Sequence, residues 1–156
     1  MLTVHLWGVL FLYVLSNFNV YFMKIYFATS IRGANDAINS NILLIGALKK
    51  YGTVLTEHFM NIADDGETDL SDKEIHDRDL KWIDDCDVIV AEVTNPSLGV
   101  GYEIRYGIEN GKRILCLKHK NEKRLSAMIS GSDYLEVEEY KDEDEINKLL
   151  SDFFEE

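Results

Sequence analysis

The chain has 156 residues, which is enough for one domain with a hydrophobic core and too few for two ordinary domains. Hydrophobic residues make up 46% and charged residues 28%, as in globular proteins. The formal net charge of −12 argues against broad nucleic-acid binding, because no basic stripe is present to neutralise phosphates, but a small anionic ligand remains compatible with it.

Residues 1–22 differ in composition from the rest of the chain. They carry almost no charge, and they lack the basic start of a signal peptide. The run is near the lower limit for a membrane span, and Ser16, Asn17 and Asn19 interrupt it. Because Met23 opens a sequence that reads as a single domain over 23–156, we interpret residues 1–22 as an extension of doubtful translation. A membrane anchor, an uncleaved signal and a packed helix are the alternatives.

Predicted strands and helices alternate from Met23 onward. Strands are expected at 24–29, at 53–56, in the first half of 87–103, at 113–117 and at 134–137. Helices are expected from 35 or 36 to Gly52, from Ser71 to about 85, up to 110–111, at 123–130, and from 142 or 144 onward. This alternation predicts an α/β protein with a parallel sheet covered on both faces, and such sheets bind ligands at the carboxyl ends of their strands.

The stretch 87–103 is the most informative part of the chain. It begins as a buried strand, and Pro96 stops that strand because proline cannot donate to the sheet. We expect Ser97, Gly99 and Gly101 to form a small-residue loop and Glu103 to lie in the first turn of the next helix. A helix N-terminus favours anions, so this loop predicts a nucleotide or sugar-phosphate site.

A second loop, Ser30-Ile31-Arg32-Gly33, follows the first strand. A hydroxyl, a guanidinium and a glycine amide can together hold a phosphate, although an ordinary strand-to-helix turn would also explain these residues. Because both loops are expected at the same edge of the sheet, each supports the interpretation of the other as a phosphate-binding loop.

Glu103 and Asp79 are the candidate carboxylate pair. Cleavage of a glycosidic bond needs one carboxylate at the anomeric carbon and one acid at the leaving group. Each residue also has a structural explanation: Asp79 as a solvated helix residue and Glu103 as a partner of the helix dipole. Glu92, inside the strand, is a rival that we rank as hydrogen-bonded scaffold. Tyr26 is expected to be a core ring whose hydroxyl reaches the strand ends.

Cysteine and histidine spacing predicts no metal site. Cys86 and Cys116 are the two cysteines, and we interpret both as reduced core thiols of a cytoplasmic or nuclear protein. His58 and His76 lack the spacing of metal ligands.

Several segments resemble one known family: 25–27 with 30–33, 54–58, 90–94 with 96–103, 113–117 and 125–129. They are similar to the 2'-deoxynucleoside 5'-phosphate N-hydrolases of the nucleoside 2-deoxyribosyltransferase superfamily. Pro96 to Glu103 and Ser126 to Ile129 are the specific motifs. The resemblance covers residues 23 to about 154, and departs at Thr29, where the family has glycine, and at Ala34.

The resemblance implies a flavodoxin-like three-layer sandwich with a five-stranded parallel sheet, a homodimer, and no metal or organic cofactor. The implied reaction cleaves deoxynucleoside monophosphates to a free base and 2-deoxyribose 5-phosphate. By motif, Glu103 is the nucleophile, Asp79 assists proton transfer at the base, and Tyr26 orients the nucleophile.

The resemblance also implies the substrate-binding residues. They are Ser30, Ile31, Arg32, Gly33, Ser97 and Gly99 at the phosphate, with Ser126 reaching the phosphate across the dimer interface beside Met128. Two alternatives stay open: a nucleoside 2-deoxyribosyltransferase, which needs room for an acceptor base, and a nucleotide-binding module without catalysis.

Overall fold

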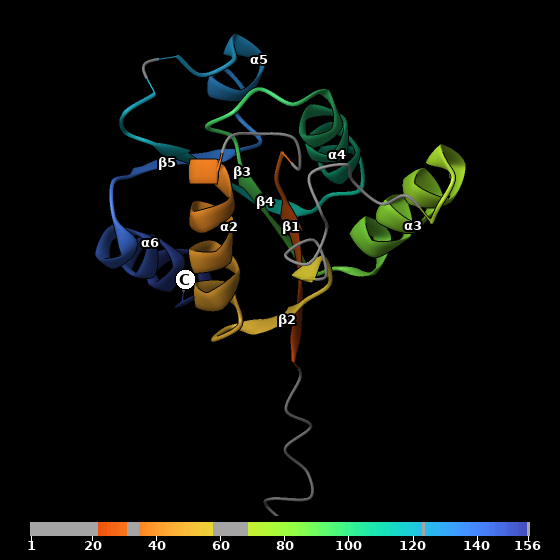
Figure 1. Ribbon diagram of the computed structural model, residues 1–156, viewed down its shortest axis with the longest axis horizontal. Coiled ribbons are helices and arrows are strands. Elements are labelled where there is room, and N and C mark those ends of the chain that lie inside the picture. The colour runs from red at the N-terminus through yellow and green to blue at the C-terminus, as the bar shows by residue number, and fades with distance from the viewer. Residues whose placement is uncertain (1–21, 31–34, 58–68, 123, 156) are drawn as a thin grey trace, which may run out of the picture.

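The computed structural model describes residues 22–30, 35–57, 69–122 and 124–155 (Figure 1). Its strands are β1 (Met23–Ala28), β2 (Gly52–Val54), β3 (Val88–Glu92), β4 (Arg113–His119) and β5 (Glu136–Tyr140). Its helices are α2 (Asn35–Leu48), α3 (Asp72–Asp85), α4 (Leu98–Glu109), α5 (Ala127–Ser130) and α6 (Glu143–Glu155). The predictions for residues 1–21 and for Ile31, Arg32, Gly33, Ala34 and His58 fall outside the described residues. Within the described ranges, no helix is both long and apolar enough to cross a membrane.

The five strands form one parallel sheet in the order β2-β1-β3-β4-β5. This is the flavodoxin-like order, with the chain reversing direction across the sheet between β1 and β3. Helices α2 and α6 pack together on one face of the sheet, and α3 and α4 pack together on the other (Figure 1). The predicted three-layer α/β sandwich is therefore confirmed.

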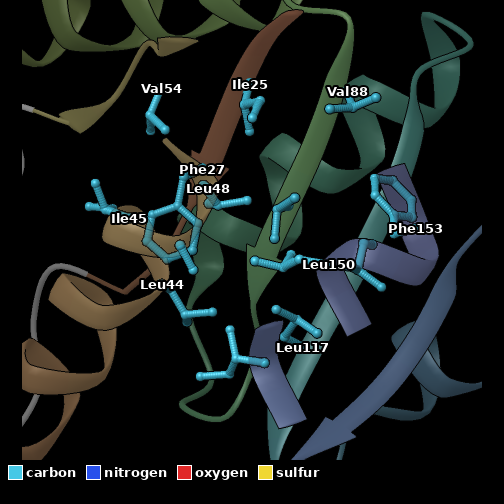
Figure 2. Close-up of a cluster of buried hydrophobic side chains, with 14 of the residues drawn as sticks. Ile25, Phe27, Leu44, Ile45, Leu48, Val54, Val88, Leu117, Leu150 and Phe153 are labelled. Atoms are coloured by element: carbon cyan, nitrogen blue, oxygen red, sulfur yellow. The ribbon is translucent and has the colours of Figure 1, made fainter. Parts of the chain in front are cut away.

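The face covered by α2 and α6 holds a core of hydrocarbon side chains (Figure 2). Ile25 and Phe27 of β1 meet Leu44 and Leu48 of α2 and Leu150 of α6, and all five are fully buried. Because side chains alternate along a strand, the intervening residues of β1 point to the opposite face. That opposite face carries the candidate site.

Two of the elements predicted in the second half of the chain need correction. The last strand is Glu136–Tyr140 rather than 134–137, because β5 is an edge strand whose exposed glutamates conceal the alternating pattern. The predicted helix over 123–130 is reduced to α5, which begins after its cap Ser126. In α2, Leu44, Ile45 and Leu48 are buried toward the sheet, whereas Ile42 and Leu43 are 47% and 45% exposed.

Glycines act at two turns near the sheet. Gly52 does not end α2 as predicted but opens β2, where a Cβ atom would lie 2.1 Å from the Met23 carbonyl oxygen. Gly111 follows the α4 cap Asn110 and has a φ of 67°, in the left-handed region that favours glycine. The predicted end of α4 is therefore confirmed.

Candidate active site

Three side chains from three elements converge beneath α3 and α4: Tyr26 of β1, Asp79 of α3 and Glu103 of α4. Burial raises the pKa of the Tyr26 hydroxyl above its usual range, and the negative charges of Glu103 and Asp79 raise it further. Burial also raises the pKa of Glu103 to about 7; the Tyr26 hydroxyl lowers it and the charge of Asp79 raises it. These couplings place the three groups in one cluster.

The Tyr26 hydroxyl is the unusual member of this cluster. It is buried, and among the described residues it makes no hydrogen bond of ordinary geometry. The Glu103 carboxylate lies close enough for the two groups to shift each other's pKa. Buried polar groups are nearly always satisfied, so an exception beside a carboxylate marks a candidate functional site.

Helix α4 presents Glu103 on its inner side. Its N-cap is Ser97, whose hydroxyl accepts from the Val100 amide at 3.4 Å while the Ser97 backbone stays extended. The helix therefore starts at Leu98, Gly99 and Gly101 lie within it, and Glu103 is in its second turn. The expectations of a glycine loop reaching 101 and of a first-turn glutamate were wrong.

Asp79 is oriented by its neighbour on α3. The Arg78 Nε and Nη2 atoms donate to Asp79 Oδ1 at 3.0 and 2.9 Å, and the guanidinium lies 4.6 Å from the Trp82 ring centroid. The Arg78 and Asp79 side chains are only 21% and 13% exposed, so Asp79 is not the solvated helix residue of the structural explanation. Sequence reasoning missed Arg78, because adjacent helical residues do not usually face each other.

Glu92 is hydrogen-bonded scaffold, as expected. It is buried at the end of β3, where it accepts from the Thr94 hydroxyl and, at 3.2 Å, from the Tyr140 hydroxyl. The Thr94 hydroxyl oxygen also accepts from the His119 amide at 2.8 Å, so the ends of β3, β4 and β5 are tied together. Burial raises the pKa of Glu92 above its usual range.

The two predicted phosphate loops are described unequally. Ser30 is half-buried and has an interaction partner, whereas 31–33 lie outside the described residues. Thr29, the departure from the family pattern, donates its hydroxyl to Asn41 Oδ1 of α2 at 2.9 Å. Ser97 stands at the N-terminus of a 12-residue helix, with Gly99 exposed in its first turn. This second loop retains the geometry of an anion site.

Ser126 and Met128 lie across a cavity from α4. The Ser126 hydroxyl accepts from the Met128 amide at 3.3 Å and begins α5. Both residues line a cavity of about 880 Å³ between α4 and the segment 124–135. Its rim carries three strongly exposed side chains, with exposed fractions of 97% for Leu98, 83% for Met128 and 75% for Tyr134. Exposed apolar side chains gathered at one rim are typical of interaction surfaces.

Comparison with known proteins now places the chain. The family model described as nucleoside 2-deoxyribosyltransferase matches residues 25–146. A 5-hydroxymethyl-dUMP N-hydrolase of Danio rerio is 47% identical over 139 residues, covering 85% of this chain and 96% of the relative. The chain belongs to the nucleoside 2-deoxyribosyltransferase family. The resemblance carried by 96–103 and 126–129 is thereby confirmed.

More distant members of the comparison agree. The human 5-hydroxymethyl-dUMP N-hydrolase is 42% identical over 138 residues, covering 84% of this chain and 79% of the human protein. A solved CMP N-glycosidase of Clostridium botulinum superposes with a TM-score of 0.60 at 17% identity, covering 83% of this chain and 98% of that one. The superposition shows that the two proteins share a fold.

The cysteines of this family member lie in the same core cluster as Tyr26, on the face of the sheet toward α3 and α4. Cys86 and Cys116 are both buried and unpaired. Burial raises their pKa values to about 11 and about 12, so both are held as thiols at neutral pH. In the described ranges, no group of histidine, cysteine and carboxylate side chains is arranged to hold a metal ion.

Proposed function

We propose that this chain hydrolyses the N-glycosidic bond of 2'-deoxynucleoside 5'-monophosphates. The products are the free base and 2-deoxyribose 5-phosphate. The observation that carries the proposal is the cluster of the buried Tyr26 with the partly buried Asp79 and Glu103, present in a chain 47% identical to a protein named 5-hydroxymethyl-dUMP N-hydrolase. Two partly buried carboxylates that raise each other's cost of ionisation are typical of a catalytic site rather than of a ligand-binding module without catalysis.

Each member of the cluster has a chemical role. The ionised Glu103 carboxylate attacks C1 of the deoxyribose as the bond to the base breaks, and Asp79 assists the transfer of a proton from water to the departing base. Water then cleaves the glycosyl-enzyme ester and restores the Glu103 carboxylate. Tyr26 lies beside Glu103 and orients its carboxylate for attack. Arg78 holds Asp79 in place.

The substrate phosphate binds between two loops. Ser97 and Gly99 present the N-terminus of α4, and Ser30, Ile31, Arg32 and Gly33 supply a hydroxyl, amides and a guanidinium. These contacts lie away from C1, so they orient the nucleotide and distinguish it from a nucleoside.

A second copy of the chain completes the site. The apolar cavity beside α4, ringed by the exposed Leu98, Met128 and Tyr134, suits a homodimer interface. Ser126 lies on that surface, and we assign it to the phosphate bound by the partner subunit. The two buried free thiols fit a reducing compartment, the cytoplasm or the nucleus.

The decisive assay incubates the protein with deoxynucleoside monophosphates, 5-hydroxymethyl-dUMP first, and with the matching nucleosides, and measures free base by chromatography. Release from the monophosphates alone supports the proposal. Release from nucleosides, or only when an acceptor base is added, favours the transferase reaction for which the family model is named. No release from any substrate rejects catalysis in favour of binding.

Mixing two inactive variants tests the dimer. Glu103→Gln lacks the nucleophile, and Ser126→Ala lacks the proposed partner contact. If Ser126 acts across the interface, the mixed dimer contains one site with both residues intact, so activity returns on mixing. If Ser126 acts within its own subunit, no site is restored and activity stays low.

A further inference from the structure

Helices α3 and α4 are joined side chain to side chain at two levels. His76 Nε2 and the Tyr102 hydroxyl are 3.3 Å apart, and their rings lie 5.8 Å apart at 50°. Eight residues further along α3, Asp84 Oδ1 accepts from the Tyr106 hydroxyl at 3.0 Å. Asp79 lies between His76 and Asp84 on α3.

The same order holds on α4, where Glu103 lies between Tyr102 and Tyr106. The two contacts therefore stand on either side of the Asp79–Glu103 pair along both helices. Beneath the pair, on the sheet, lies Tyr26.

We propose that the His76–Tyr102 and Asp84–Tyr106 contacts are positioning contacts that fix the separation of Asp79 and Glu103. The inference rests on the proposed function. It assigns a role in the reaction to four residues that neither the phosphate loops nor the carboxylate cluster include. The His76–Tyr102 contact is the more influential of the two, because Tyr102 adjoins Glu103 and His76 lies one turn from Asp79.

The His76 ring is itself held in place. Its Nδ1 atom lies 3.1 Å from Asp77 Oδ1, and Asp77 in turn pairs with Lys73 one turn earlier. In the neutral ring, a proton on Nδ1 directed at Asp77 leaves Nε2 as the acceptor for the Tyr102 hydroxyl. In the His76–Tyr102 contact the tyrosine hydroxyl therefore donates to the histidine ring, and Asp77 holds that ring in place.

Overall stability does not explain these contacts. His76, Tyr102 and Asp84 are exposed, and hydrogen bonds between exposed groups contribute little to folding. Buried side chains hold the helices on the sheet, Ile83 for α3 and Ile104 for α4. Removing one tyrosine hydroxyl should leave the fold intact and loosen only the spacing between the helices.

That spacing has a measurable consequence at Glu103. Among the described residues, the groups that act on its carboxylate are Tyr26 from β1 and Asp79 from α3, with Arg78 paired to Asp79. If α3 moves outward, water reaches Glu103 and the charge of Asp79 is farther away. Both changes lower the pKa of Glu103 toward its ordinary value.

The test compares Tyr102→Phe with Tyr51→Phe. Tyr51 stacks on Phe154 on the opposite face of the sheet, so its variant is a matched loss of one hydroxyl. We expect Tyr102→Phe to lower kcat by about tenfold with little change in KM. The acidic midpoint of the kcat/KM profile should also move down by about half a pH unit, since the pKa of Glu103 follows its desolvation. Tyr51→Phe should change neither.

The partner residue sharpens the test. His76→Ala should reproduce the loss in kcat, and the His76→Ala/Tyr102→Phe double variant should be no worse than either single variant. Additive losses would mean that the two residues act separately, and would overturn the proposal. A rise in KM alone would make Tyr102 a substrate contact and would equally overturn it. If Tyr102→Phe does not fold, Tyr106→Phe provides the same measurement with a smaller expected effect.

A direct titration separates this inference from the proposed function. Carboxyl NMR of Glu103, made without substrate, reports its pKa in the parent protein and in Tyr102→Phe. A protein without hydrolase activity would refute the proposed function while leaving this measurement intact. An unchanged Glu103 pKa in a folded Tyr102→Phe variant would refute the positioning role alone.

Discussion

The two faces of the sheet are built from the same strands and differ in kind. Toward α2 and α6, β1 directs Ile25 and Phe27 into a core lined by hydrocarbon (Figure 2). Toward α3 and α4, the same strand directs Tyr26, whose buried hydroxyl lies beside the carboxylates of Asp79 and Glu103. Neighbouring residues of β1 therefore point to opposite faces, one with a hydrocarbon core and one with the candidate site.

The two faces differ in how their buried side chains affect stability. Burying Phe27 or Leu150 removes apolar surface from water and stabilises the fold. Burying Glu103 opposes folding, because desolvation disfavours its charged form, as its raised pKa records. A partly buried carboxylate next to another carboxylate costs stability, which is typical of functional sites.

The largest effect is expected at the reactive face. Glu103→Gln keeps the shape of the side chain and removes the carboxylate that we propose as the nucleophile, so kcat should fall by about a thousandfold or more. The free energy of unfolding at pH 8 should stay the same or rise, because an amide has no charge to desolvate. Base release and urea unfolding measure the two quantities. Near-normal turnover would show that Glu103 is not the nucleophile.

Matched core truncations test the separation of the faces. Leu150→Ala and Ile104→Ala each remove a buried side chain, and each should lower the free energy of unfolding by about 2–5 kcal/mol. Only Ile104 adjoins Glu103 on α4, so only Ile104→Ala should also lower kcat. Activity measured at temperatures where both variants remain folded decides the point. An equal loss of kcat in both variants would contradict the separation.

The fold was largely predictable because most of its helices and strands follow from short sequence patterns. The capping box at Ser71 and Glu74 and the stop at Gly111 fixed the ends of α3 and α4. β5 was misplaced, because an edge strand tolerates exposed charge and needs no alternation on its outer side. Gly52 was misassigned, because its close approach to Met23 is a contact between strands.

The candidate site was predictable only in part. Glu103, Asp79 and Tyr26 were candidates from the residues and received their roles from a resemblance, and the structure brings these three together. The capping signal at Ser97 was overlooked, so Glu103 was placed one turn too early. Arg78 beside Asp79 and His76 opposite Tyr102 follow no sequence periodicity, because they depend on how two helices pack on the sheet.

The pH dependence of stability should carry the signature of Glu103. Its pKa is about 7 in the folded protein against 4.5 for the ordinary side chain, so the folded state binds more protons between these values. Stability from this group is therefore fully present below pH 4.5 and is lost as the pH rises through 7, by at most about 3 kcal/mol. Urea unfolding at pH 5 and pH 8 should show this loss in the parent protein relative to Glu103→Gln, where the other titrating groups cancel. Equal pH slopes in both proteins would place Glu103 in a wetter environment.

The smallest effects compare the helix caps of the two faces. The Ser71 hydroxyl accepts from the Glu74 amide at 3.3 Å at the start of α3, and Asp142 Oδ1 accepts from the Glu145 amide at 3.1 Å at the start of α6. Replacing either residue by alanine should lower the free energy of unfolding by about 1 kcal/mol, because one helix amide loses its partner. The consequences for activity should differ, since α3 carries Asp79 and α6 carries no residue of the candidate site. Ser71→Ala should therefore reduce kcat about twofold to threefold through fraying of α3 toward His76, while Asp142→Ala should leave kcat unchanged. If the two variants lose activity equally, the first turn of α3 has no special connection to the carboxylate pair, and the sheet separates the faces less completely than their composition indicates.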